Sequence, residues 1–164
     1  MTAEASSEIR SAVRRLVFAS GGRMIPRPIF RDRPGGGSNR EEPEPLHAIR
    51  AAAALEYEAG QALASAVRYA REDGQAWGEI GAALYPGDPL AGQPAVAAKT
   101  FVRFAWQSDK WQVLSFGWTC PACLQTISDH GPDSSGYPSE TEEGHTDGCP
   151  RLAAAITEYE RGRD

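Results

Sequence analysis

The chain has 164 residues, 41% of them hydrophobic, which is enough for one domain or two small ones. No apolar run is long enough to cross a bilayer and no stretch reads as a signal peptide, so the sequence predicts a cytoplasmic protein without a membrane segment. The net charge of −5 is unevenly distributed: residues 1–40 contain eight Arg against three Asp/Glu, and residues 41–164 contain nine Lys/Arg against nineteen Asp/Glu. Such an acidic body opposes polyanion binding, so a nucleic-acid role requires a local basic patch or the arginine-rich N-terminal arm.

The N-terminal segment is predicted to be a short amphipathic helix followed by a linker. Apolar residues recur at helical spacing from Ile9 to Val17, and Gly21-Gly22 ends the pattern. Residues 23–45 are rich in Pro, Gly and Arg and offer little apolar surface to offset the entropy cost of ordering. We therefore expect a flexible linker there.

Three helices are predicted between residues 46 and 108. An Ala-rich helix runs from about Leu46 to Asp73 and is ended by Gly74. A second helix covers Ala76 to Tyr85, and a third begins at Pro94 and ends near Trp106. Their inward-facing positions follow the helical period. These positions are Ile49, Ala53, Leu63, Val67 and Ala70 in the first helix, Trp77, Ile80, Gly81 and Leu84 in the second, and Ala97, Phe101 and Phe104 in the third.

From residue 109 onward the pattern changes to strand, loop and helix. The aromatic and β-branched stretch Trp111–Trp118 predicts a strand, and Leu124–Ile127 is its candidate hairpin partner. Residues 131–148 form a polar, acidic segment interrupted by Gly and Pro, which we expect to be a loop. A final helix is predicted from Pro150 through Tyr159.

Three cysteines and one histidine have the spacing of a zinc site. Cys120-Pro121-Ala122-Cys123 is followed, after 21 residues, by His145 and Cys149. Cys149 directly precedes a helix, where the converging N–H groups favour a thiolate. Three sulfurs and one imidazole complete a tetrahedral shell, so we expect Cys120, Cys123, His145 and Cys149 to hold one structural zinc ion.

Two alternatives to this ligand set remain open. The thiols could be simply buried and His145 solvated, or His130, seven residues after Cys123, could be the fourth ligand. The order of the parts resembles a treble-clef-like zinc finger. One departure from that pattern is Leu124, which stands where zinc knuckles often have Gly.

The sequence favours a protein that is not an enzyme. A catalytic zinc keeps one position open for water, whereas four protein ligands close the shell. In zinc deaminases a His and a Glu precede the Cys-x-x-Cys pair, but here the order is reversed and Asp147 stands in place of that Glu. We interpret Glu142 and Glu143 as part of an acidic surface loop.

Residues Ala70–Leu84 resemble the first part of helix-turn-helix domains common in actinobacterial regulators, through Trp77, Ile80-Gly81 and Leu84. The resemblance implies that Ala95–Ala105 is a recognition helix. The connection Tyr85–Gln93 is longer than the usual turn of about three or four residues. The candidate DNA-contacting residues are Gln93, Lys99, Thr100 and Arg103.

The basic residues of this helix have a second interpretation. Lys99 and Arg103 share one helical face, and that face could be merely solvated in a small helical bundle. The chain would then be a zinc-finger adaptor that binds a protein partner and does not contact DNA.

Over roughly residues 46–160 the chain resembles uncharacterised actinobacterial proteins that combine a helix-turn-helix-like segment with a C-terminal Cys-Pro-x-Cys…His-x-x-x-Cys zinc module. The predicted fold is mainly α: a helical, helix-turn-helix-like bundle followed by a small treble-clef-like module with a short β-hairpin and a C-terminal helix. The predicted function is a zinc-stabilised regulatory protein that binds duplex DNA, with the protein adaptor as the alternative. The predicted segments are 1–45 (helix and linker), 46–108 (helical region) and 109–164 (zinc-binding module).

Overall fold

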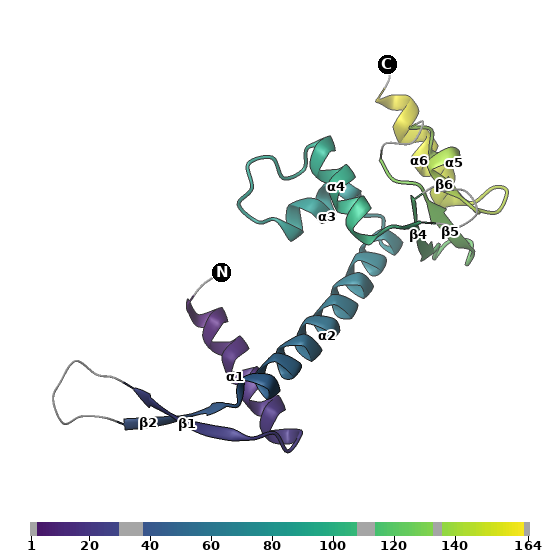
Figure 1. Cartoon of the computed structure of the whole chain (residues 1–164). Helices are drawn as coiled ribbons and strands as arrows, with labels where there is room; N and C mark the ends of the chain where they lie inside the picture. Colours follow the sequence, from purple (N-terminus) through teal and green to yellow (C-terminus); the bar gives the residue numbers. More distant parts are fainter. Residues whose placement is uncertain (1–2, 30–37, 108–113, 133–135, 163–164) are drawn as a thin grey trace. The chain divides into compact units, whose positions relative to one another are not determined.

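The computed structural model describes residues 3–29, 38–107, 114–132 and 136–162 (Figure 1). The fold is mainly helical, with one two-stranded and one four-stranded antiparallel sheet. The chain divides into two compact units, Met1–Ala62 and Leu63–Asp164, with the boundary inside helix α2 (Pro45–Glu72). Within the described ranges, every helix is too short or too polar to cross a membrane.

The first unit contains α1 (Ala3–Ala19), a β-hairpin and the N-terminal part of α2. Strand β1 (Met24–Ile29) pairs antiparallel with β2 (Ser38–Pro43), in a register that places Met24 opposite Pro43 and Ile29 opposite Ser38. The prediction of a flexible linker is therefore wrong for these two strands, and its central part, residues 30–37, lies outside the described residues.

The prolines of β1 explain how this segment can still pair. Pro26 and Pro28 are two residues apart, so both missing N–H groups fall on the same edge of the strand. A strand with an open edge tolerates proline there, because no ladder hydrogen bond is lost. The composition of the segment indicated a linker, because composition does not take the spacing of Pro26 and Pro28 into account.

The first unit buries few large side chains. Among its described residues only Val17 (1% exposed) and Ala51 (8%) are buried hydrophobics. The predicted inward stripe of α2 is wrong in this half: Ile49 is 63% exposed, and Ala53 is also exposed. In the other half of α2 the prediction is correct, since Val67 is 3% exposed.

The second unit begins with the C-terminal part of α2, followed by α3 (Trp77–Leu84) and α4 (Pro94–Phe104), which pack together (Figure 1). Gly74 ends α2 in a left-handed conformation (φ +94°), and its N–H donates to the carbonyl of Arg71. The Ala76 N–H donates to the Glu79 carboxylate at 2.8 Å, which satisfies one free donor at the start of α3. These boundaries lie within two residues of the predicted ones.

Four short strands form the sheet of the second unit, in the order β3-β4-β5-β6. Between β5 and α6 the predicted loop contains a helical turn, α5, and a two-residue strand, β6, so the loop prediction is wrong there. The final helix α6 agrees with its prediction. The bounds are β3 Trp106–Gln107, β4 Leu114–Thr119, β5 Thr126–Asp129, α5 Pro138–Thr141, β6 Glu142–Glu143 and α6 Pro150–Arg161.

One hydrophobic core joins the helices of the second unit to its sheet. The Trp77 ring meets Phe101 of α4 edge-on at 5.3 Å and Phe116 of β4 at 5.2 Å between centroids. Cys120 and Cys149 belong to the same buried cluster as these aromatics. The predicted helical region and the predicted zinc-binding segment therefore share a core.

Candidate metal centre

The four predicted metal ligands converge at one end of the sheet in the second unit. Cys120 directly follows β4, Cys123 lies in the turn before β5, and Cys149 is the N-cap of α6. His145 follows β6. Their ligand atoms all lie within 4.8 Å of one another, which is close enough to hold one metal ion.

The spacing of these atoms fits a tetrahedral zinc shell. With Zn–S of about 2.3 Å and Zn–N of about 2.0–2.1 Å, tetrahedral geometry requires S···S of about 3.8 Å and S···N of about 3.6 Å. The Cys120 and Cys149 sulfurs are 3.8 Å apart, and Cys123 Sγ lies 3.6 Å from His145 Nδ1. The donor set and these two ligand–ligand distances are thus compatible with zinc.

A tight turn places the first two sulfurs. The Leu124 N–H donates to the Cys120 carbonyl at 2.8 Å, and the Cys120 N–H donates to the Gln125 carbonyl at 2.9 Å. Leu124 has φ +59°, the left-handed conformation that a glycine usually supplies, and its side chain is 77% exposed. The turn is therefore regular although the expected glycine is absent, at a backbone cost of about 1 kcal/mol.

The protein environment acts in opposite directions on two of the thiols. A hydrogen bond from the Thr146 backbone N–H is the main reason that the pKa of Cys123 falls to about 6, with a further contribution from Gln125. Burial raises the pKa of the Cys120 thiol. Metal coordination requires thiolates, so the Thr146 N–H favours the metal-binding form of Cys123.

Glu142 fixes the orientation of the His145 ring. The ring is 1% exposed and directs Nδ1 toward the sulfurs, while its Nε2 lies 3.3 Å from Glu142 Oε2. In the tautomer that carries its N–H at Nε2, the ring donates to this carboxylate and leaves Nδ1 free to bind metal. The interpretation of Glu142 as part of a surface loop is therefore wrong. Its position three residues before His145 is the sequence feature that could have indicated this contact.

A buried arginine connects this carboxylate to the helices. Arg71, near the end of α2, donates to Glu142 Oε1 at 2.7 Å and pairs with Asp129 at 2.7 Å. Asp129 also accepts the indole N–H of Trp77 at 3.0 Å. Arg71 and Asp129 are 7% and 2% exposed, so these bonds satisfy charges that would otherwise be costly to bury. Sequence reasoning missed both residues, because no local pattern relates Arg71 to a site so distant along the chain.

His130 is the rejected alternative among the ligands. Its Nε2 lies 3.4 Å from a Glu143 carboxylate oxygen, and the ring is not among the four groups that converge. Among the described residues, His145 and not His130 is therefore the histidine that lies with the three cysteines.

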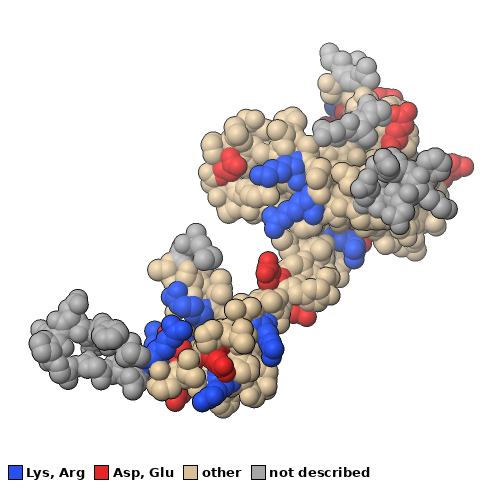
Figure 2. Space-filling view, viewed as in Figure 1, with Lys and Arg blue, Asp and Glu red and all other residues tan. Residues whose placement is uncertain are grey.

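The predicted DNA-contacting residues of α4 divide into two groups. Gln93, Lys99 and Arg103 are exposed, and Figure 2 shows their part of the surface, with Lys and Arg side chains over the α3–α4 pair. Thr100 is fully buried and donates to the Val96 carbonyl at 2.7 Å. Its predicted contact with DNA is therefore wrong, because the Thr100 side chain faces Gly81 of α3.

Tyr85 holds both cations of α4 on one face. Lys99 Nζ lies 5.4 Å from the centre of the Tyr85 ring, and an Arg103 N–H donates to the Tyr85 hydroxyl at 3.4 Å. Neither cation forms an ion pair with a carboxylate in the described parts of the chain. Both charges are therefore available to an external anion.

Comparison of the chain with protein-family models, with curated proteins and with solved structures found no match. The assignment of function therefore rests on the chemistry of the two sites described above.

Proposed function

We propose that this chain is a cytoplasmic, zinc-stabilised regulatory protein that presents α4 to duplex DNA. The metal is structural. Three thiolates and an imidazole are a donor set that suits zinc, and a reducing compartment keeps such thiols free.

The order of the metal-binding parts supports a treble-clef-like module without catalytic function. A Cys-x-x-Cys turn between β4 and β5 is followed by His145 and then by Cys149 at the start of α6. Four protein ligands leave no position for the water molecule that a hydrolytic zinc site activates. The Arg71 and Glu142 side chains are used to orient a ligand, which is the role expected around a structural metal.

The exposed cation pair on α4 is the observation that carries the proposal of DNA binding. Lys99 and Arg103 stand one helical turn apart, and Gln93, the N-cap of the helix, is also exposed. The α3–α4 pair that supports them contains Trp77 and Ile80-Gly81, the residues that carry the resemblance to helix-turn-helix domains. Its nine-residue connection, from Tyr85 to Gln93, is longer than that of the usual motif.

Salt-dependent binding to duplex DNA tests this proposal. Lys99→Ala with Arg103→Ala should weaken binding and lower the slope of log K against log salt by about two, because two phosphate contacts are lost. Far-UV circular dichroism and zinc content should stay unchanged, since both side chains lie on the surface.

A matched variant in the first unit separates α4 from the arginine-rich arm. Arg10→Ala with Arg14→Ala also removes two cations, of which Arg10 is exposed and Arg14 half-buried, and it should leave the salt slope nearly unchanged. If the arm variant abolishes binding while the α4 variant binds like the parent chain, α4 is not the DNA-binding element.

The alternative is a protein-interaction adaptor, and exposed apolar side chains near α4 favour it. Val102 is 56% exposed, Trp106 60% and Leu90 53%, so these side chains offer apolar surface to a protein partner. Absence of duplex binding by the parent chain at low salt would leave the adaptor as the function.

A further inference from the structure

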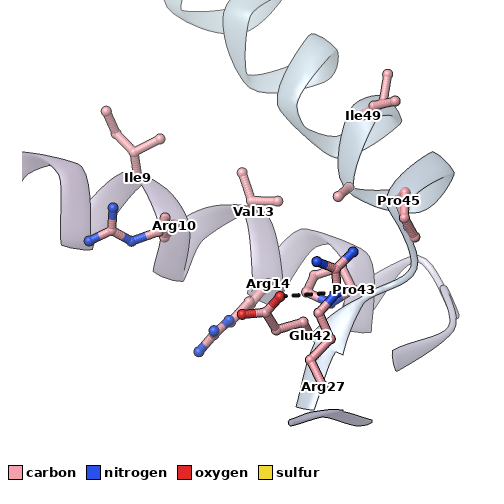
Figure 3. A pocket seen from close by; sticks show the side chains of 10 residues that line it. Ile9, Arg10, Val13, Arg14, Arg27, Glu42, Pro43, Pro45 and Ile49 are labelled. Carbon is pink, nitrogen blue, oxygen red and sulfur yellow. Dashed lines mark ion pairs between the residues drawn. The ribbon is translucent and has the colours of Figure 1, made fainter. Parts of the chain in front are cut away.

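The first unit contains an open apolar groove between α1 and α2. Two neighbouring hollows, of about 440 Å³ and about 360 Å³, share Ile9 and Val13 of α1. Figure 3 shows the first of these hollows, with Ile9 and Val13 on one helix and Ile49 on the other. The groove is lined on the α2 side by Pro45, Ala48, Ile49, Ala52, Leu55, Glu56 and Ala59.

The groove has the length and period of a helix-binding surface. Its α2 positions recur every three or four residues, so they form a single stripe along the helix. From Pro45 to Ala59 the helix rises about 21 Å, at about 1.5 Å per residue. A partner helix of about four turns would therefore lie along the whole groove.

Several of the lining side chains are left exposed, and the others, such as Val13 and Leu55, are half-buried. Ile9 is 51% exposed and Ile49 63%, whereas Val17 and Ala51 are the buried hydrophobics of this unit within its described part. An isolated unit of this size needs more apolar burial than two such residues provide. A third helix in the groove would supply this additional apolar burial.

The charges around the groove specify the partner's chemistry. Arg10 and Arg14 of α1 border the first hollow and also line an adjoining polar hollow with Arg40. No carboxylate pairs with these three arginines in the described ranges, while the one acidic residue of the first hollow, Glu42, is paired with Arg27 at 3.6 Å (Figure 3). The border at this end of the groove is therefore cationic. The second hollow is lined by Glu56 and by no arginine, so the cationic border is confined to the first hollow.

We propose that this groove binds an acidic amphipathic helix of a partner protein. The partner's apolar residues, at i, i+3, i+4 and i+7, would pack on Ile9, Val13 and Ile49, and its Asp or Glu residues would pair with Arg10 and Arg14. A second copy of this chain fits less well, because its α1 would bring two more arginines to the same border. The proposal concerns a surface separate from α4 and does not depend on DNA binding.

Two labelled peptides of about sixteen residues test the proposal on the full-length, zinc-loaded chain. Both carry Leu at i, i+3, i+4 and i+7, with Glu at the flanking positions of one and Lys at those of the other. Fluorescence anisotropy should show the Glu peptide binding at least about tenfold more tightly. Arg10→Glu with Arg14→Glu should reverse that preference.

Apolar variants test the groove itself. Ile9→Ser with Ile49→Ser should weaken the Glu peptide at least about tenfold, because both anchors are removed. Phe18→Ser is the matched control: Phe18 is 81% exposed on the same helix, does not line the groove, and should leave affinity unchanged. Helical content measured by circular dichroism confirms that each variant is folded.

Three results would overturn the proposal. The first is equal affinity of the parent chain for the two peptides, and the second is binding that does not respond to the Ile9 and Ile49 changes. The third is a parent chain that sediments as a dimer and becomes monomeric in the Ile9→Ser, Ile49→Ser variant, which would assign the groove to a second copy.

Discussion

Glu142 is the residue that joins the metal ligands to the rest of the second unit. One of its oxygens lies against the His145 ring and the other accepts from Arg71. The neighbouring Glu143 differs in both respects, because it is 77% exposed and contacts His130 instead. These two adjacent carboxylates therefore form a matched pair for testing the role of the first.

Glu142→Gln should lower zinc affinity by about tenfold or more, since it removes the charge that favours a metal-bound imidazole. Glu143→Gln should leave the affinity unchanged. Competition with a chromophoric chelator measures both. Equal affinities in the two variants would show that the contact between Glu142 and His145 does not support metal binding.

The ligand assignment makes a second prediction at this scale. His145→Ala and Cys149→Ser should each abolish stoichiometric zinc binding and lower the thermal midpoint, because structural zinc supplies much of the folding free energy of a small module. His130→Ala should retain one zinc per chain. Elemental analysis decides between the two histidines, and a reversed order would make His130 the ligand.

At the scale of elements, α3 and α4 approach closely because Gly81 has no side chain. A Cβ at this position would lie 2.8 Å from Thr100 Oγ1 and 3.0 Å from a Val96 methyl. At Gly78, one turn earlier in the same helix, the nearest atom would be 3.4 Å away, which is close to ordinary van der Waals contact. The two glycines of α3 thus have different roles.

Gly81→Ala should destabilise the chain by about 1–3 kcal/mol, because the added methyl group overpacks the interface between the helices. Gly78→Ala should change stability by less than about 1 kcal/mol, since alanine's better helix propensity offsets a mild contact. Urea unfolding measures both. A Gly81→Ala variant as stable as the parent would mean that α3 and α4 are not packed this closely.

At the scale of the whole molecule, the second unit has one core in place of two separate modules. Cys120 and Cys149 belong to the cluster that contains Trp77, Ile80 and Phe101. Arg71 and Arg151 strengthen this connection. Arg151 of α6 donates to the Arg71 and Glu72 carbonyls at the end of α2, and its guanidinium lies 4.0 Å from the Trp118 ring centre.

Removal of zinc should therefore unfold α3 and α4 together with the metal-binding turn. Without metal, no bonds join Cys120 and Cys149 to Cys123 and His145, so the shared core loses the link that holds the metal-binding turn and α6 together. Hydrogen exchange after chelation should show loss of protection in α4 amides as well as around Cys123. If the α4 amides stay protected while the turn exchanges, the helices and the metal-binding module are independent.

The sequence by itself determined the helices of the second unit and the four residues that converge as candidate metal ligands. Trp77, Ile80 and Phe101 recur at the helical period, and the Cys-x-x-Cys spacing is a local signal that needs no knowledge of the fold. Helix boundaries followed from residues such as Gly74 and Pro94, whose backbone preferences act locally.

Only the tertiary structure decided which long-range contacts complete these elements. Composition could not show that residues 24–29 and 38–43 pair as strands, because pairing depends on a register between separated segments. Nor could it show that Thr100 faces α3, or that Arg71 lies between Asp129 and Glu142, 58 and 71 residues away. Burial and ion pairing are properties of residues that meet in space, whereas the sequence pattern reports only those that are neighbours along the chain.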